Sequence, residues 1–165
     1  MRRRTLLQAA TLGTILGTTL GATLGALPIA TLARTDDKPQ ITVYKTPTCG
    51  CCHEWVAHLE KNGFAVTAQD VPDTEPYRDR YGVPRALASC HTGVIDGYAL
   101  EGHVPAAEIK RLIAEKPRAR GLAVPGMPVG SPGMEVDGHR RDAFDVVLFD
   151  DAGGRRVYQH YDARR

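Results

Sequence analysis

The chain has 165 residues, enough for one ordinary domain with a buried core and an additional segment. Its formal net charge is +2, but three arginines at positions 2–4 supply this excess, because 21 Lys+Arg less these three leaves 18 against 19 Asp+Glu. A remainder near neutrality gives no support to a nucleic-acid partner.

Residues 1–33 have the composition of an export signal. They combine an arginine cluster, a long apolar stretch and small residues near Ala33, and they contain no acidic residue. Arg3 and Arg4, followed by Thr-Leu-Leu-Gln, resemble a twin-arginine signal. We therefore expect export to the periplasm by the twin-arginine route and removal of this segment. An uncleaved membrane anchor is the alternative, although the glycines and threonines of the stretch disfavour a spanning helix.

A polar, flexible lead-in is expected at residues 34–40, and periodicity and turn residues predict the elements that follow it. In chain order these are a strand at 41–44, a helix at 50–62, a strand at 64–68, a short helix within 72–82, a hairpin of 92–95 with 98–101, and a helix at 105–116. Gly63 ends the first helix as a left-handed cap, and Asp96-Gly97 is a strong two-residue hairpin signal.

This order predicts an α/β fold with a mixed sheet flanked by helices. A helical crossover implies parallel pairing of the first two strands, and the hairpin adds antiparallel strands. The order resembles a thioredoxin-like domain, which we expect at residues 41–116. The CxxC pair Cys49 and Cys52 lies where such folds keep theirs, between the first strand and the first helix.

The C-terminal part departs from that plan. Residues 121–144 are rich in Gly and Pro, which predicts an ordered loop or a wrapping arm rather than helix or sheet. Residues 146–149 and 156–161, on either side of a turn, predict a terminal β-hairpin. We expect residues 117–165 to pack, as a Met-containing arm and hairpin, on the same domain.

Three of the four cysteines, Cys49, Cys51 and Cys52, fall within four residues and are called the thiol cluster here. A helix N-terminus favours the thiolate of Cys49, and Cys52 lies one turn later, within reach of a disulfide. Two structural disulfides are the alternative for an exported chain, but the adjacent Cys51 and Cys52 bridge only with strain. Thiol exchange does not need Cys51, whereas a soft metal is bound and bridged by several sulfurs.

Further soft donors occur later in the chain. Counted back from the Asp96-Gly97 turn, Ser89 falls near the point where thioredoxins enter the third strand and carry a cis-proline that touches the active thiols. The resemblance therefore implies that Cys90 lies beside the thiol cluster, and we expect His103 at the same end of the sheet. Met127 and Met134 lie in the Pro/Gly-rich loop PGMPVGSPGM, where they are either thioether donors on a shaped arm or filler over an apolar patch.

The other histidines are weaker candidates. His53 is a plausible ligand, and His58 is expected on the solvated face of its helix. Because neighbours on a strand face opposite sides, we expect His91 to point away from Cys90.

This sulfur-rich donor set suits copper(I), and it has more donors than one ion needs. We therefore expect more than one copper, bridged by thiolates. Zinc with four cysteines remains an alternative, although zinc ligands usually come as pairs on separate knuckles. Iron–sulfur clusters use other spacings.

Three segments resemble the CopG-type family of periplasmic copper-resistance proteins: VYKTPTCGCCHEWVAHLEKNGF, YGVPRALASCHTGVIDGYALEGHVPAAEIKRLI and VPGMPVGSPGM. The resemblance runs over residues 41–161. It implies a thioredoxin-like fold, a cysteine-bridged multinuclear copper centre, and a role in exported copper handling. Interconversion of copper(I) and copper(II) is its candidate activity, and other periplasmic copper-handling proteins are its candidate partners. The metal ligands that it implies are Cys49, Cys51, Cys52, Cys90, His103, Met127 and Met134.

The leading hypothesis is an exported copper-binding protein in copper resistance, with Cys49 and Cys52 as the catalytic pair if it is redox active. The alternative is a thiol–disulfide oxidoreductase in which Cys49 attacks and Cys52 resolves. A third interpretation is a structural zinc domain that binds a partner protein.

Overall fold

The structure is a computed structural model that describes residues 38–138 and 140–164. The predicted export signal at residues 1–33 lies outside this part of the chain, as does the beginning of the predicted lead-in. None of the helices in the described ranges has the length and apolar character that a bilayer crossing requires.

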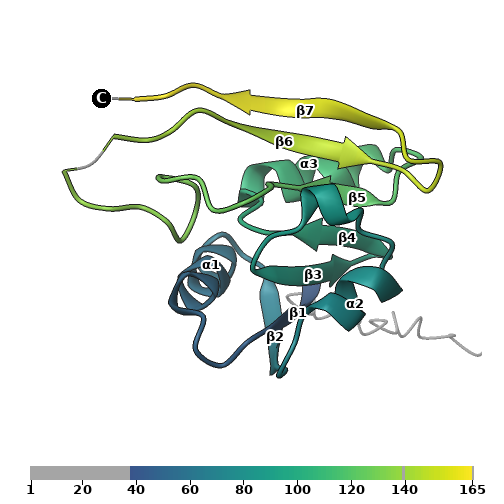
Figure 1. The fold of residues 1–165 in the computed structure, drawn as a ribbon, viewed down its shortest axis with the longest axis horizontal. Helices are drawn as coiled ribbons and strands as arrows, with labels where there is room; N and C mark the ends of the chain where they lie inside the picture. Colours follow the sequence, from purple (N-terminus) through teal and green to yellow (C-terminus); the bar gives the residue numbers. More distant parts are fainter. Residues whose placement is uncertain (1–37, 139, 165) are drawn as a thin grey trace, which may run out of the picture. The chain divides into compact units, whose positions relative to one another are not determined.

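The described residues form a seven-stranded mixed sheet with helices on both faces (Figure 1). The elements are β1 (Gln40–Lys45), α1 (Gly50–Lys61), β2 (Ala65–Asp70), α2 (Glu75–Arg80), the 3-10 helix η1 (Arg85–Leu87), β3 (His91–Ile95), β4 (Tyr98–Glu101), α3 (Ala106–Glu115), β5 (Gly121–Ala123), β6 (Phe144–Phe149) and β7 (Arg155–Tyr161). The strand order is β2-β1-β3-β4-β5-β6-β7. The predicted mixed α/β class is confirmed, and the thioredoxin-like assignment stays a prediction.

Local turn signals fix much of this order. Gly63 has a φ of 89° just after α1, and Asp96 and Gly97 have φ values of 47° and 82° between β3 and β4. Positive φ at both central residues is what a tight hairpin between twisted strands needs. β1 pairs with β2 in parallel, and β3 pairs with β4 in antiparallel fashion, as predicted. β3 also pairs with β1 in antiparallel fashion.

The prediction that residues 121–144 contain no sheet is wrong at its beginning. Gly121–Ala123 forms β5, which pairs in parallel with β4 and in antiparallel fashion with β6. A Cβ on Gly121 would lie 2.0 Å from the carbonyl oxygen of Ala99, so only glycine allows this approach of the two backbones. The glycine acts here as a pairing residue, and the irregular arm is limited to residues 124–143.

The sheet has two distinct packing faces. One face, which includes Leu100 and Leu122, packs with residues of α1 and α3 in the larger core cluster. The other face, which includes Ala99 and Phe149, packs with residues that follow α2. α1 is buried at Cys52, Trp55 and Leu59, while Val56 is only partly buried.

Candidate metal centre

The N-terminus of α1 carries the thiol cluster. Cys49 is the N-cap residue and forms a disulfide with Cys52, which is fully buried, whereas Cys51 and Cys90 are free and half-buried. The Sγ of Cys51 lies 3.6 Å from that of Cys49 and 4.0 Å from that of Cys90. All four sulfurs lie within 4.8 Å of one another, so they form one group that could hold a metal.

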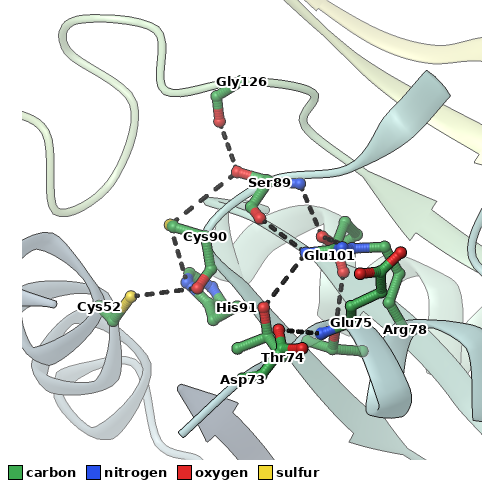
Figure 2. Close-up of polar contacts among 11 residues, drawn as sticks. Cys52, Asp73, Thr74, Glu75, Arg78, Ser89, Cys90, His91, Glu101 and Gly126 are labelled. Atoms are coloured by element: carbon green, nitrogen blue, oxygen red, sulfur yellow. Dashed lines mark hydrogen bonds and ion pairs between the residues drawn. The ribbon is translucent and has the colours of Figure 1, made fainter. Parts of the chain in front are cut away.

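Strand pairing explains why Cys90 reaches this group. β3 runs antiparallel to β1, and its first residue, His91, lies opposite Lys45, the last residue of β1. Cys90 therefore lies at the end of the central strands where β1 finishes, next to the N-terminus of α1. The Cys52 Sγ lies 3.8 Å from the carbonyl oxygen of Cys90. Figure 2 draws this contact as a dashed line.

Two buried histidines complete a second set of donors around Cys90. Its Sγ lies 3.3 Å from Nδ1 of His91 and 3.4 Å from Nε2 of His103. These three donor atoms also lie within 4.8 Å of one another. The prediction that His91 points away from Cys90 is wrong, because β3 begins at His91 and the alternation of a strand does not extend to the residue before it.

The imidazole orientations are set by neighbours. The His91 ring packs on the Trp55 ring, with centroids 4.2 Å apart. The Ser131 hydroxyl donates to the carbonyl of Pro128 at 2.7 Å, so its oxygen is left to accept from Nδ1 of His103 at 3.3 Å. That tautomer leaves a lone pair on Nε2 of His103, directed toward Cys90.

Burial sets the protonation states of this second set. It lowers the pKa of His91 to about 3, with the nearby His103 adding to the effect, and it lowers the pKa of His103 to about 4. Burial, together with Cys51, raises the pKa of Cys90 to about 12. The imidazoles are therefore neutral at neutral pH, and the free Cys90 thiol is protonated there.

The arm covers this site. Ser131 is fully buried beside His103, and a Cβ on Gly133 would lie 2.7 Å from the carbonyl oxygen of Cys51. The half-buried Met134 follows directly, whereas Met127 is 54% exposed. The predicted ligand roles of these two methionines stay predictions.

Two further histidines of α1 have other partners. Nε2 of His53 lies 2.8 Å from Nζ of Lys45. The expectation that His58 is solvated is wrong, because it is half-buried and its Nε2 accepts a hydrogen bond from the backbone N–H of Ala106 at 3.2 Å. His58 thus satisfies a backbone donor of the first turn of α3.

His91 and Ser131 were not predicted from the sequence as members of the site. The adjacency of His91 to Cys90 was visible, but the position at which the strand begins was not. The role of Ser131 depends on how the arm folds back over the sheet, for which the sequence carries no local signal.

Comparisons with known proteins give one matching family model and two similar solved structures. A family model described as "Protein of unknown function, DUF411" matches residues 87–134, the segment that holds Cys90, His103 and both methionines. Two solved structures, titled "Copper resistance protein copG- Form 2" and "Copper resistance protein copG- Form 1", are 48% identical to this chain, with TM-scores of 0.72 and 0.71. Each match covers 76% of this chain and 99% of the solved chain. No curated protein matches.

Proposed function

Because the chain belongs to the CopG family of copper resistance proteins, we propose that it binds several copper(I) ions as its cargo, outside the cytoplasm. The protein ligands in this proposal are the thiol cluster, Cys90 and His103, with His91 added by the geometry. Met127 and Met134 supply thioether sulfurs, which also suit copper(I). Met134 is the better placed of the two, since its neighbour Gly133 contacts Cys51.

One observation carries the multinuclear part of the proposal: the two donor sets share the sulfur of Cys90. One set consists of the four sulfurs and the other of Cys90 with two imidazole nitrogens. A thiolate that faces both sets can bridge copper ions held by each. Together the sets offer more donors than one ion of low coordination number uses.

The thiol cluster also supplies electrons in this proposal. Two thiolates, on Cys49 and Cys52, give one electron each to two copper(II) ions and join in the disulfide, which yields two copper(I) ions. The reverse step transfers two electrons from two copper(I) ions to the disulfide and restores both thiolates. Cys49 and Cys52 are bonded in the structure, which supports this pairing, while Cys51 and Cys90 keep their free thiols as ligands.

An anaerobic copper(I) titration of the reduced protein against a competing chelator tests the proposal. We expect several ions per chain, and a sharp fall in their number in Cys51→Ser. His53→Asn is a matched control, since His53 is adjacent to the cluster but contacts Lys45, and it should leave the number unchanged. A single weakly held ion in the wild type and in Cys51→Ser would contradict a bridged centre.

A thiol–disulfide oxidoreductase is the second candidate. The half-buried Cys49 and the fully buried Cys52 have the arrangement of an attacking and a resolving thiol at a helix N-terminus. Catalysed reduction of a disulfide substrate by the copper-free protein, unaffected by Cys51→Ser and Cys90→Ser, would favour this function over copper handling.

Export is proposed to depend on residues 1–33. Replacement of Arg3 and Arg4 by lysine should abolish a twin-arginine signal. Cell fractionation with antibody detection is the measurement. Unchanged recovery of the variant in the periplasmic fraction would contradict the twin-arginine route.

A further inference from the structure

A buried ion pair lies on the opposite face of the sheet from the two histidines. Glu101, at the end of β4, is fully buried, and Arg78, in α2, is 12% exposed. Arg78 Nε donates to Glu101 Oε1 at 3.0 Å. Figure 2 shows this pair on one side of the Ser89–Cys90 segment and Cys52 of α1 on the other.

The pair holds both backbone polar groups of Ser89. The Ser89 N–H donates to Glu101 Oε1 at 2.7 Å, and Arg78 Nη2 donates to the Ser89 carbonyl at 3.0 Å. The second carboxylate oxygen accepts from Thr92 Oγ1 at 2.7 Å, and Nη2 also donates to Thr74 Oγ1 at 3.2 Å. We call Arg78, Glu101 and Thr92 the Ser89 clamp.

Ser89 needs such support because it lies between regular elements. η1 ends at Leu87 and β3 begins at His91, so neither a helix nor a strand ladder holds the backbone of the residue before Cys90. The Ser89 hydroxyl in turn donates to the carbonyl of Gly126 at 2.5 Å. The clamp therefore holds the backbone next to Cys90, and through the Ser89 hydroxyl it is connected to the arm at Gly126.

A purely stabilising role accounts poorly for these charges. Burying an ion pair costs desolvation, and a well-packed apolar pair is often as stable or more stable. The ion pair adds geometry, because the planar guanidinium donates at fixed angles to two acceptors at once. Here those acceptors are a carboxylate and the carbonyl next to Cys90.

We propose that the Ser89 clamp consists of positioning residues that hold the Cys90 sulfur between the thiol cluster and the two histidines. This inference rests on the proposed copper site for its functional meaning. Outer-shell partners that orient metal ligands typically change metal affinity about 10- to 100-fold when they are replaced. Arg78→Lys keeps the charge, but the single lysine nitrogen cannot reproduce the geometry with which two guanidinium nitrogens donate to Glu101 and to the Ser89 carbonyl.

The test compares Arg78→Lys with Arg111→Lys as its matched control. Arg111 also donates through Nη2 to a backbone carbonyl, that of Tyr158, which belongs to β7 rather than to the site. Two quantities are measured: copper(I) affinity by chelator competition, and the ratio of Cys90 to Cys51 alkylation rates in the copper-free protein that retains the Cys49–Cys52 disulfide. The alkylation ratio reports the placement of Cys90 without copper.

We expect Arg78→Lys to weaken copper affinity about 10- to 100-fold and to change the alkylation ratio, while Arg111→Lys changes neither. Thr92→Val removes only the hydroxyl and should shift both quantities in the same direction by less. If Arg78→Lys fails to fold, Thr92→Val decides by the same two measurements.

A wild-type affinity and alkylation ratio in both clamp variants would overturn the inference, even where their stability falls. A wild-type protein that binds no copper would instead contradict the proposed function. In that case the alkylation ratio still decides whether the clamp places Cys90.

Discussion

Near Cys90, the two faces of the sheet differ in whether a buried polar side chain has all its hydrogen-bond partners. On the α2 face, both carboxylate oxygens of Glu101 accept hydrogen bonds. Their donors are Arg78, the Ser89 backbone N–H and the Thr92 hydroxyl. On the α1 face, Nε2 of His91 has no hydrogen-bond partner among the described residues, and Nε2 of His103 contacts the thiol of Cys90. Since buried polar groups are nearly always paired, the complete set of partners around Glu101 indicates anchoring, whereas Nε2 of His91 is left open to a ligand.

Cys90→Ser should have the largest effect, because it removes the sulfur that both donor sets share. We expect a loss of copper(I) affinity beyond the roughly 10- to 100-fold of an outer-shell change, and fewer bound ions than in Cys51→Ser. Chelator competition and metal analysis measure both. Equal losses in the two variants would show that Cys90 is an ordinary member of the group and not its bridge.

Glu101→Gln tests the anchoring at Glu101 by stability. It leaves the largely buried Arg78 without a counter-charge, which we expect to lower the free energy of unfolding by about 3 kcal/mol. Glu75→Gln is the matched control, since its pair with Arg85 is exposed on both sides and is worth at most about 1 kcal/mol. Urea denaturation gives both values, and similar losses would contradict an anchoring role for Glu101.

Gly133→Ala tests how closely the arm covers the donor face. Its Cβ would meet the backbone of Cys51 and Trp55 at 2.7 and 2.8 Å, atoms that move only if α1 moves. Gly153→Ala is the control, because its φ of 84° is close to the 86° of Gly133 and nothing lies within 4 Å. Both should lose about 1–2 kcal/mol of unfolding free energy to backbone strain, and Gly133→Ala about 1–3 kcal/mol more.

Copper affinity separates the two glycine variants further. Because the Cys51 backbone lies in the first turn of α1, a clash with the Cβ that Gly133→Ala adds should displace the thiol cluster and weaken copper binding, while Gly153→Ala should bind as the wild type does. Equal stability and affinity in the two variants would show that the arm does not press on the thiol cluster.

The sequence predicted the elements that have local causes. Gly63 and Asp96-Gly97 act within a few residues, and the CxxC spacing brings Cys49 and Cys52 together within one helical turn. The terminal hairpin was likewise predicted from alternation around a turn, and β6 pairs with β7. These features were accessible because neighbours in sequence are also their structural partners.

Features with distant partners were not predictable. By residue type, Gly121 indicates a break in regular structure, and its role in strand pairing depends on the close approach of Ala99. By residue type, Glu101 indicates a surface position, and its burial depends on Arg78, 23 residues earlier. The unpaired nitrogen of His91 is of the same kind, because it depends on where β3 begins. The sequence could therefore indicate the four cysteines and His103 as candidates, but not the contribution of His91 or the clamp that holds Ser89.

Ser131→Ala gives the smallest and most specific test, since the Ser131 hydroxyl is the hydrogen-bond partner of Nδ1 of His103. Without the hydroxyl, Nδ1 of His103 loses its acceptor, and the tautomer with a lone pair on Nε2 is no longer favoured. One hydrogen bond contributes about 0.5–1.5 kcal/mol, which corresponds to a two- to tenfold loss of copper affinity. Nitrogen NMR of the copper-free protein reports the tautomer directly. If His103 keeps its tautomer in Ser131→Ala and copper affinity is unchanged, the arm only shields the site, and the orientation of His103 comes from its packing against His91.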